Sequence, residues 1–172
     1  MEDIQPIIAR REVTTRILQA FHLKADKNLG QNFLVEESVV NRIAKAAELT
    51  PEDTVLEIGP GIGTLTQALA MTGASVVSVE LDKRLIPVLQ ETVGAYENVR
   101  IVQGDILKVN IPEIIASVKE ESKNAGTAGE NPGATDAASF KVCANLPYYI
   151  TTPIIMYLLE QKLPLERLVV MV

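Results

Sequence analysis

Four short segments of the chain carry residue types that can do chemistry, and each one follows an apolar run. The runs, for example residues 54–58 and 99–103, have the length and β-branched content of buried strands. Ligands bind at the carboxyl ends of parallel strands in open α/β folds, so we expect the four segments to form one pocket. The segments are Glu57 to Gly63, Glu80, Gly104-Asp105 and Asn145 to Tyr148.

The first segment is a glycine turn with an acidic residue before it. Gly59, Gly61 and Gly63 permit positive φ angles and let a ligand approach the backbone. The spacing lacks the third glycine of the dinucleotide fingerprint, Pro60 removes an amide, and no P-loop lysine follows, so we exclude a dinucleotide and a nucleoside triphosphate. Glu57 would be costly to bury alone, so we expect it to accept hydrogen bonds from the turn or from a ligand's ammonium group.

The next two segments suit an adenosine. Glu80 ends the second strand, where a carboxylate can accept hydrogen bonds from both ribose hydroxyls. Asp105 ends the third strand and can accept one from the adenine amino group. An adenosine without a diphosphate beside a glycine turn describes S-adenosyl-L-methionine, which we therefore predict as the cofactor.

The fourth segment indicates the reaction. An exocyclic amino nitrogen becomes nucleophilic only as it pyramidalises, because its lone pair is otherwise delocalised. Asn145 Oδ1 and the Leu146 carbonyl can accept its two N–H bonds and direct the lone pair toward the sulfonium methyl. Pro147 stiffens that carbonyl, and Tyr148 offers a ring on which a flipped base can stack. We predict these four residues as the catalytic group. Cys143 lies inside a strand without a base nearby, and we interpret it as a core residue.

Strand-like and helix-like patterns alternate along the chain, which predicts a doubly wound parallel α/β sheet in a single domain, 1–172. Residues 119–139 contain no large apolar side chain, and we expect a mobile surface insertion. The expected strands are 54–58, 75–80, 99–103, 140–144 and 168–172, and the expected helices are 10–21, 36–48, 64–72, 84–92, 111–118 and 153–161.

Composition narrows the class of protein further. The 172 residues carry a net charge of −6, which argues against a surface that is basic throughout. One cysteine and one histidine cannot form a Cys/His metal cluster, so we predict no metal. The absence of a long apolar run predicts no membrane association and a cytoplasmic protein. Nucleic acid must therefore meet a local basic cluster, for which the candidates are Arg10, Arg11, Arg16, Lys24 and Lys27.

These segments together resemble the ribosomal RNA adenine N6-dimethyltransferases. Gly30 to Leu34 is similar to the family's Q-N-F-L cofactor motif, and Glu57 to Gly63 to its E-x-G-P-G-x-G loop. The resemblance implies a Rossmann-like class I fold for methyltransferases that use S-adenosyl-L-methionine, with five of the usual seven strands. It adds Gln31, Asn32, Leu34, Ile106 and Asn145 to the expected cofactor pocket.

Residues 145–153, and the part of the predicted helical leader (1–35) that precedes Gln31, resemble the small-subunit branch of this family. The resemblance implies dimethylation of two adjacent adenosines near the 3′ end of 16S rRNA in the 30S subunit or its precursor, by a monomer. We expect the chain to be truncated before the family's helical RNA-binding domain, and thus to bind cofactor but turn over poorly. The alternatives are an amino-group methyltransferase acting on 23S rRNA, DNA adenine or protein glutamine, and a non-catalytic module that binds ribosomes or nucleic acid.

Overall fold

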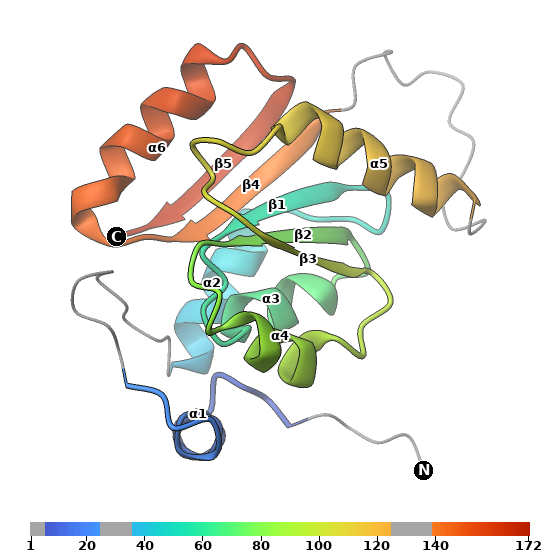
Figure 1. The fold of residues 1–172 in the computed structure, drawn as a ribbon. Helices are drawn as coiled ribbons and strands as arrows, with labels where there is room; N and C mark the ends of the chain where they lie inside the picture. Colours follow the sequence, from blue (N-terminus) through green and yellow to red (C-terminus); the bar gives the residue numbers. More distant parts are fainter. Residues whose placement is uncertain (1–5, 25–35, 125–138) are drawn as a thin grey trace.

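The molecule is built around one sheet of five parallel strands. The structure, a computed structural model, describes residues 6–24, 36–124 and 139–172. The strands lie in the order β3-β2-β1-β4-β5, so the chain reverses its direction of winding between β1 and β4 (Figure 1). This is the predicted doubly wound fold. The strands are β1 Thr54–Ile58, β2 Ser75–Glu80, β3 Val99–Gln103, β4 Phe140–Asn145 and β5 Leu165–Met171.

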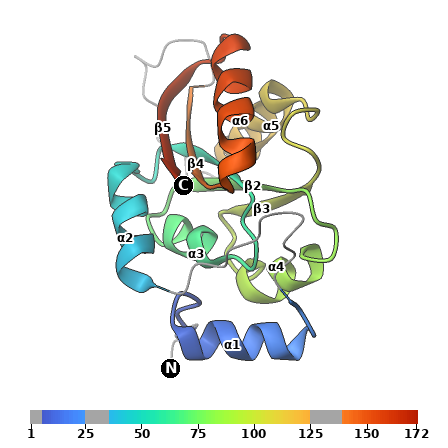
Figure 2. The same cartoon turned by 90° about the vertical axis from the view of Figure 1, so that its left-hand side faces the viewer.

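Helices cover both faces of the sheet (Figure 1, Figure 2). Side chains that alternate along a strand point to opposite faces: Val55 packs against α2 and α3, and Leu56 packs against α5 and α6. By the same alternation Glu57 faces α3. Helix α1 lies outside α3 and α4 (Figure 2). The helices are α1 Arg11–Ala20, α2 Glu37–Ala46, α3 Thr64–Ala70, α4 Ile86–Val93, α5 Ile111–Asn124 and α6 Tyr148–Glu160.

Three predicted boundaries are wrong. Helix α6 begins at Tyr148, not at Pro153, so this proline lies inside the helix. The first turn forms nonetheless because Pro147 is the extended N-cap and its carbonyl accepts hydrogen bonds from Ile150 N and Thr151 Oγ1. Strand β5 begins at Leu165, earlier than predicted, because it continues its pairing with β4 back to Phe140.

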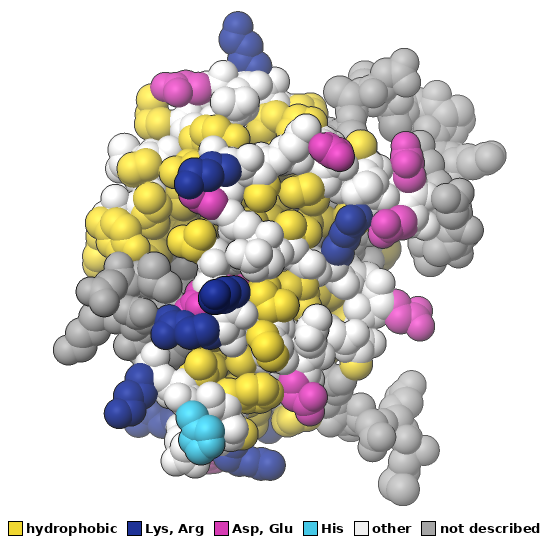
Figure 3. Space-filling view, viewed as in Figure 1, with side chains coloured by type: hydrophobic (Ala, Val, Ile, Leu, Met, Phe, Trp, Pro, Cys, Tyr) yellow, Lys and Arg dark blue, Asp and Glu magenta, His cyan; other side chains and the backbone are white. Residues whose placement is uncertain are grey.

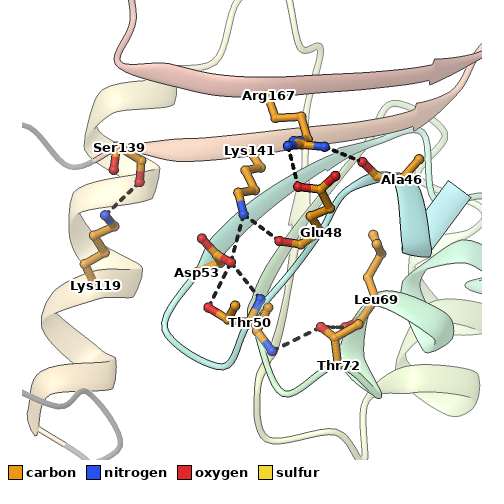
Figure 4. A network of polar contacts seen from close by, with 11 residues as sticks. Ala46, Glu48, Thr50, Asp53, Leu69, Thr72, Lys119, Ser139, Lys141 and Arg167 are labelled. Atoms are coloured by element: carbon orange, nitrogen blue, oxygen red, sulfur yellow. Dashed lines mark hydrogen bonds and ion pairs between the residues drawn. The ribbon is translucent and has the colours of Figure 1, made fainter.

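The third correction concerns the expected insertion, 119–139. Helix α5 continues through its first residues to Asn124, so that part is not a loop. Lys119 Nζ donates to the Ser139 carbonyl at 2.7 Å, which places the two ends of the segment side by side (Figure 4). Residues 125–138 lie outside the described residues, and the prediction for them is untested.

A polar cluster ties α2 to the strands at their amino-terminal ends (Figure 4). Lys141 Nζ donates to Asp53 Oδ2 at 2.9 Å and to the Glu48 carbonyl at 2.7 Å. Asp53 also accepts hydrogen bonds from the Thr50 amide and hydroxyl. Arg167 donates to the Ala46 carbonyl and pairs with Glu48. We call these six residues the amino-end cluster; it joins β1, β4 and β5 to the end of α2.

Candidate functional site

A cavity of about 620 Å³ lies at the carboxyl ends of the strands. All four predicted segments contribute to its wall, including Gly59, Glu80, Asp105 and Asn145. They meet there because β3, β2, β1 and β4 are neighbours in a parallel sheet and end at the same edge. The four segments thus lie along one cavity, although Gly61 and Gly63 are not among its lining residues, and their role in binding a cofactor stays a prediction.

Each of the three glycines in the turn has a different structural role. Gly59 has φ 69° and lines the cavity, and a Cβ built on it meets no atom of the described residues within 4 Å beyond its chain neighbours. Gly61 has φ 63°, and its amide donates to Glu80 Oε2 at 3.0 Å. Gly63 is the left-handed N-cap of α3, and a Cβ there would lie 2.9 Å from Val93 Cγ1. Gly59 therefore leaves room for a ligand, whereas Gly63 permits close packing of the turn on α4.

Glu57 is almost fully buried, and two hydroxyls hold it. Thr66 Oγ1 and Ser78 Oγ donate to its Oε2 atom at 2.7 Å and 2.6 Å. Of the two predicted kinds of partner, donors of the glycine turn are wrong, because side-chain hydroxyls on α3 and β2 take that place; a ligand's ammonium group stays a prediction. Burial raises the pKa of Glu57 to about 7, although these two hydrogen bonds lower it and the charge of Glu80 raises it further.

Backbone amides fix the two acids expected to bind adenosine. Glu80 is 5% exposed and accepts hydrogen bonds from the amides of Gly61 and Asp82. Burial raises its pKa above the ordinary value, although these amides lower it. Asp105 accepts a hydrogen bond from the Leu107 amide and lies 3.4 Å from Lys108 Nζ. Both carboxylates are oriented by the main chain, and each retains lone pairs for a ligand.

The predicted catalytic group crosses from β4 into α6. Asn145 is the last residue of β4, and Leu146, Pro147 and Tyr148 follow it along the cavity wall. The Leu146 side chain is buried in the core, and its amide donates to the Met171 carbonyl, so its own carbonyl is what remains for a ligand. Tyr148 is 80% exposed. A ring so exposed beside a cavity can stack with a planar group from outside.

The remaining predicted residues fall into three groups. Ile106 lines the cavity beside Asp105. Arg10, Arg11, Arg16 and Lys24 are exposed and do not line the cavity, and Arg10 pairs with Glu37. These four residues therefore do not belong to the cavity wall. Gln31, Asn32, Leu34 and Lys27 lie outside the described residues.

Sequence reasoning missed several cavity residues, among them Glu36, Thr64 and Leu81. Leu81 follows the acidic tip of β2, and this position was the available signal. Thr64 is the first residue of α3, where a threonine ordinarily indicates only helix capping. Its hydroxyl is buried and has no hydrogen-bond partner among the described residues.

The described residues support neither a thiolate nucleophile nor a metal site. Cys143 is completely buried, and burial raises the pKa of its thiol to about 12, so no thiolate forms near neutral pH. This confirms it as a core residue. In the described part of the chain no three His, Cys, Asp or Glu side chains group as metal ligands, and no helix is both long and apolar enough to span a membrane.

The sheet order, with a cavity at the carboxyl ends of its strands, is that of the class I methyltransferase fold, the class whose methyl donor is S-adenosyl-L-methionine. The chain belongs to the ribosomal RNA adenine dimethylase family, whose model matches residues 22–172. The predicted family, fold class and class cofactor are therefore confirmed.

Two relatives show how similar the sequences are and how much of each chain the similarity covers. A ribosomal RNA small subunit methyltransferase A of Lachnoclostridium phytofermentans is 46% identical over 160 residues, covering 92% of this chain and 50% of the relative. The same enzyme of Alkaliphilus metalliredigens is 42% identical over 159 residues, with the same coverage. The chain thus spans about half the length of these relatives.

Solved structures share the fold of this chain. The crystal structure of the 23S rRNA methyltransferase ErmE is 31% identical, with a TM-score of 0.59 over 78% of this chain and 45% of that one. A dimethyladenosine transferase from Plasmodium falciparum is 26% identical, with a TM-score of 0.51 over 74% of this chain and 38% of that one. A 23S rRNA methyltransferase and a dimethyladenosine transferase therefore share the fold of this chain.

Proposed function

We propose that this chain binds S-adenosyl-L-methionine and, as part of a protein of its relatives' length, dimethylates N6 of two adjacent adenosines near the 3′ end of 16S rRNA. The observation that carries the proposal is the convergence of Gly59, Glu80, Asp105 and Asn145 on one cavity. Family membership supports the reaction class, and the small-subunit names of the curated relatives support the choice of 16S rRNA.

The cavity fits this cofactor in size and charge. Its volume lies within the range of small-molecule sites. Four carboxylates line it, whereas no Lys, Arg or His does so among the described residues. A ligand with a sulfonium and an ammonium group complements such a wall. The open space at Gly59 admits a ligand against the backbone, Glu80 would hold the ribose hydroxyls and Asp105 the adenine amino group. The lining carboxylates are Glu36, Glu57, Glu80 and Asp105.

The cofactor supplies an electrophilic methyl group, and the chain supplies alignment. Asn145 Oδ1 and the Leu146 carbonyl accept the two N–H bonds of the adenine amino group, which favours the pyramidal nitrogen and directs its lone pair to the methyl carbon. Transfer of the methyl group to this nitrogen would leave S-adenosylhomocysteine, and the amino proton would then pass to water. Tyr148 stacks on the flipped base. Orientation of this kind is worth up to about 7–11 kcal/mol.

RNA would also contact the protein surface outside the cavity. On the face drawn in Figure 3, Lys and Arg side chains stand among acidic and hydrophobic ones. We place the phosphate contacts at Arg10, Arg11, Arg16, Lys24 and Lys27, and in a protein of the relatives' length the part outside this chain would supply more. In this proposal the protein is a monomer and acts on ribosomal precursors in the cytoplasm.

Methyl transfer from labelled S-adenosyl-L-methionine tests the function. A protein of the relatives' length that contains this chain is incubated with immature 30S subunits, with 50S precursors and with DNA. Label in N6-methylated adenines near the 3′ end of 16S rRNA is the expected result. Label in 23S rRNA would support the second candidate, which the likeness to ErmE favours. A Cys143→Ala control should transfer label at the unaltered rate, since no thiolate takes part.

A further inference from the structure

A second aromatic side chain lies exposed at the open edge of the cavity, next to Tyr148. Tyr149 is 60% exposed and lines the same cavity. Hydrophobic side chains gather where α6 begins, at the left of the view in Figure 3. The large hydrophobic side chains that are exposed and also line the cavity are Leu81, Tyr148, Tyr149 and Val172. Exposed apolar groups that gather at a cavity indicate a surface that binds a partner.

The first turn of α6 holds the two tyrosine rings in different directions. Successive residues of an α-helix lie about 100° apart around its axis, so Tyr148 and Tyr149 present separate flat surfaces. The Pro147 carbonyl accepts hydrogen bonds from Ile150 N and Thr151 Oγ1, and the Ile150 side chain packs against the core. The backbone that carries Tyr149 is therefore fixed before RNA binds, which lowers the entropic cost of a contact.

The proposed substrate supplies a second base for this ring. Methyl transfer requires that the target adenine leaves the base stack. The neighbouring base then loses a stacking partner and exposes a flat face. Aromatic side chains stack on unpaired bases in proteins that bind single-stranded nucleic acid. No Lys, Arg or His lines the cavity among the described residues, so this edge suits a base rather than a phosphate.

We propose that Tyr149 stacks on the base directly next to the one that Tyr148 holds. The contact replaces the stacking that this neighbouring base loses when the target adenine is flipped. It favours a purine at that position, because a purine overlaps an aromatic ring over a larger area than a pyrimidine does. The inference rests on the proposed function and adds to it a residue that determines specificity for the flanking nucleotide.

Methylation of altered ribosomal RNA tests the contact. A protein of the relatives' length that contains this chain is given unmethylated 30S subunits, reconstituted with natural 16S rRNA or with an abasic nucleotide directly 5′ or 3′ of the target adenosine. On natural RNA, Tyr149→Ala should lower kcat/KM about 5- to 100-fold, the range that a stacked base supplies. On one of the two abasic substrates, the variant and the unaltered protein should react within about twofold of each other. Tyr149→Phe keeps the ring and should match the unaltered protein on every substrate.

A matched variant and the pattern of rates separate this contact from the proposed function. Met156 is 48% exposed on the same helix but does not line the cavity, so Met156→Ala should change no rate. Equal loss of activity by Tyr149→Ala on all three substrates, as expected if protein rather than RNA covers the ring, overturns the contact while the proposed function stands. No loss on natural RNA has the same meaning. An unaltered protein that methylates no 16S rRNA overturns both.

Discussion

The two ends of the same strands hold polar side chains under opposite conditions. At the amino ends, Lys141 and Asp53 are largely buried and satisfy each other and nearby main-chain groups. At the carboxyl ends, one oxygen of the buried Glu57 has no hydrogen-bond partner among the described residues, and no described residue fills the space beside Gly59. The first arrangement stabilises the fold, and the second leaves hydrogen-bonding groups available to a ligand. The variants below test this division, from the largest expected effect to the smallest.

Asn145→Ala should lower the methyl-transfer rate of a full-length protein by about 10²–10³, because it removes one of two acceptors that fix the amino group. Affinity for S-adenosyl-L-methionine should change by less than about threefold. Single-turnover kinetics and calorimetry measure the two quantities. Asn110→Ala is the matched control, since Asn110 only caps α5 through the Glu113 amide. An active Asn145→Ala enzyme would contradict the proposed catalytic geometry.

Substitution of alanine for Gly63 should mainly reduce the stability of the fold, whereas the same substitution at Gly59 should mainly reduce cofactor binding. Gly63→Ala should cost about 2–4 kcal/mol of unfolding free energy, from its positive φ and the clash with Val93. Gly59→Ala carries only the φ penalty of about 1–2 kcal/mol, yet should abolish cofactor binding because its Cβ enters the cavity. Urea unfolding and calorimetry distinguish them. If each variant lost cofactor affinity in the same proportion to its loss of unfolding free energy, the distinction between the two glycines would be refuted.

Glu57 should make the unliganded chain less stable as pH rises. Its pKa is about 7 when folded and 4.5 in the unfolded reference, so the folded state holds the proton between these values. Stability therefore falls as pH rises from about 4.5 to 7, by an amount of the order of 3 kcal/mol. Glu57→Gln should flatten this part of the curve. Urea midpoints measured from pH 4 to 8 provide the test, and identical curves for the two proteins would rule out the raised pKa.

Lys141→Met should act at the other end with the opposite pH dependence. It removes a hydrogen-bonded charge from Asp53 and should cost about 1.5–3 kcal/mol, with cofactor affinity unchanged. Burial raises the pKa of Asp53, but the bonds from Lys141 and Thr50 outweigh it and hold that pKa below 3.8. This stabilisation is present above pH 3.8 and is lost as pH falls through the lowered value. The variant should therefore lose less stability on acidification. A large change in cofactor affinity would show that the two ends are not independent.

Local patterns predicted much of the fold and the order of the site. Strand β1 matches its predicted bounds because a short apolar run ending in glycine leaves few other structures. Pro153 misled the prediction of α6, because a proline usually lies in the first turn, whereas here Pro147 caps the helix earlier.

The rest depends on distant pairings. Lys141 meets Glu48 and Asp53, and Arg167 meets Ala46, only because β4 and β5 follow β1 in the sheet. The hydroxyls on Glu57 come from two other elements for the same reason. Thr64 escaped notice because a threonine at the start of a helix has an ordinary explanation.

Binding of S-adenosyl-L-methionine to the 172-residue chain and to Glu80→Ala tests the central claim most directly. Calorimetry should show one site in the unaltered chain and about a 10- to 100-fold loss in the variant, because the buried carboxylate at the tip of β2 would no longer accept from the ribose. Binding of equal strength by both proteins, or no heat from either, would contradict the account.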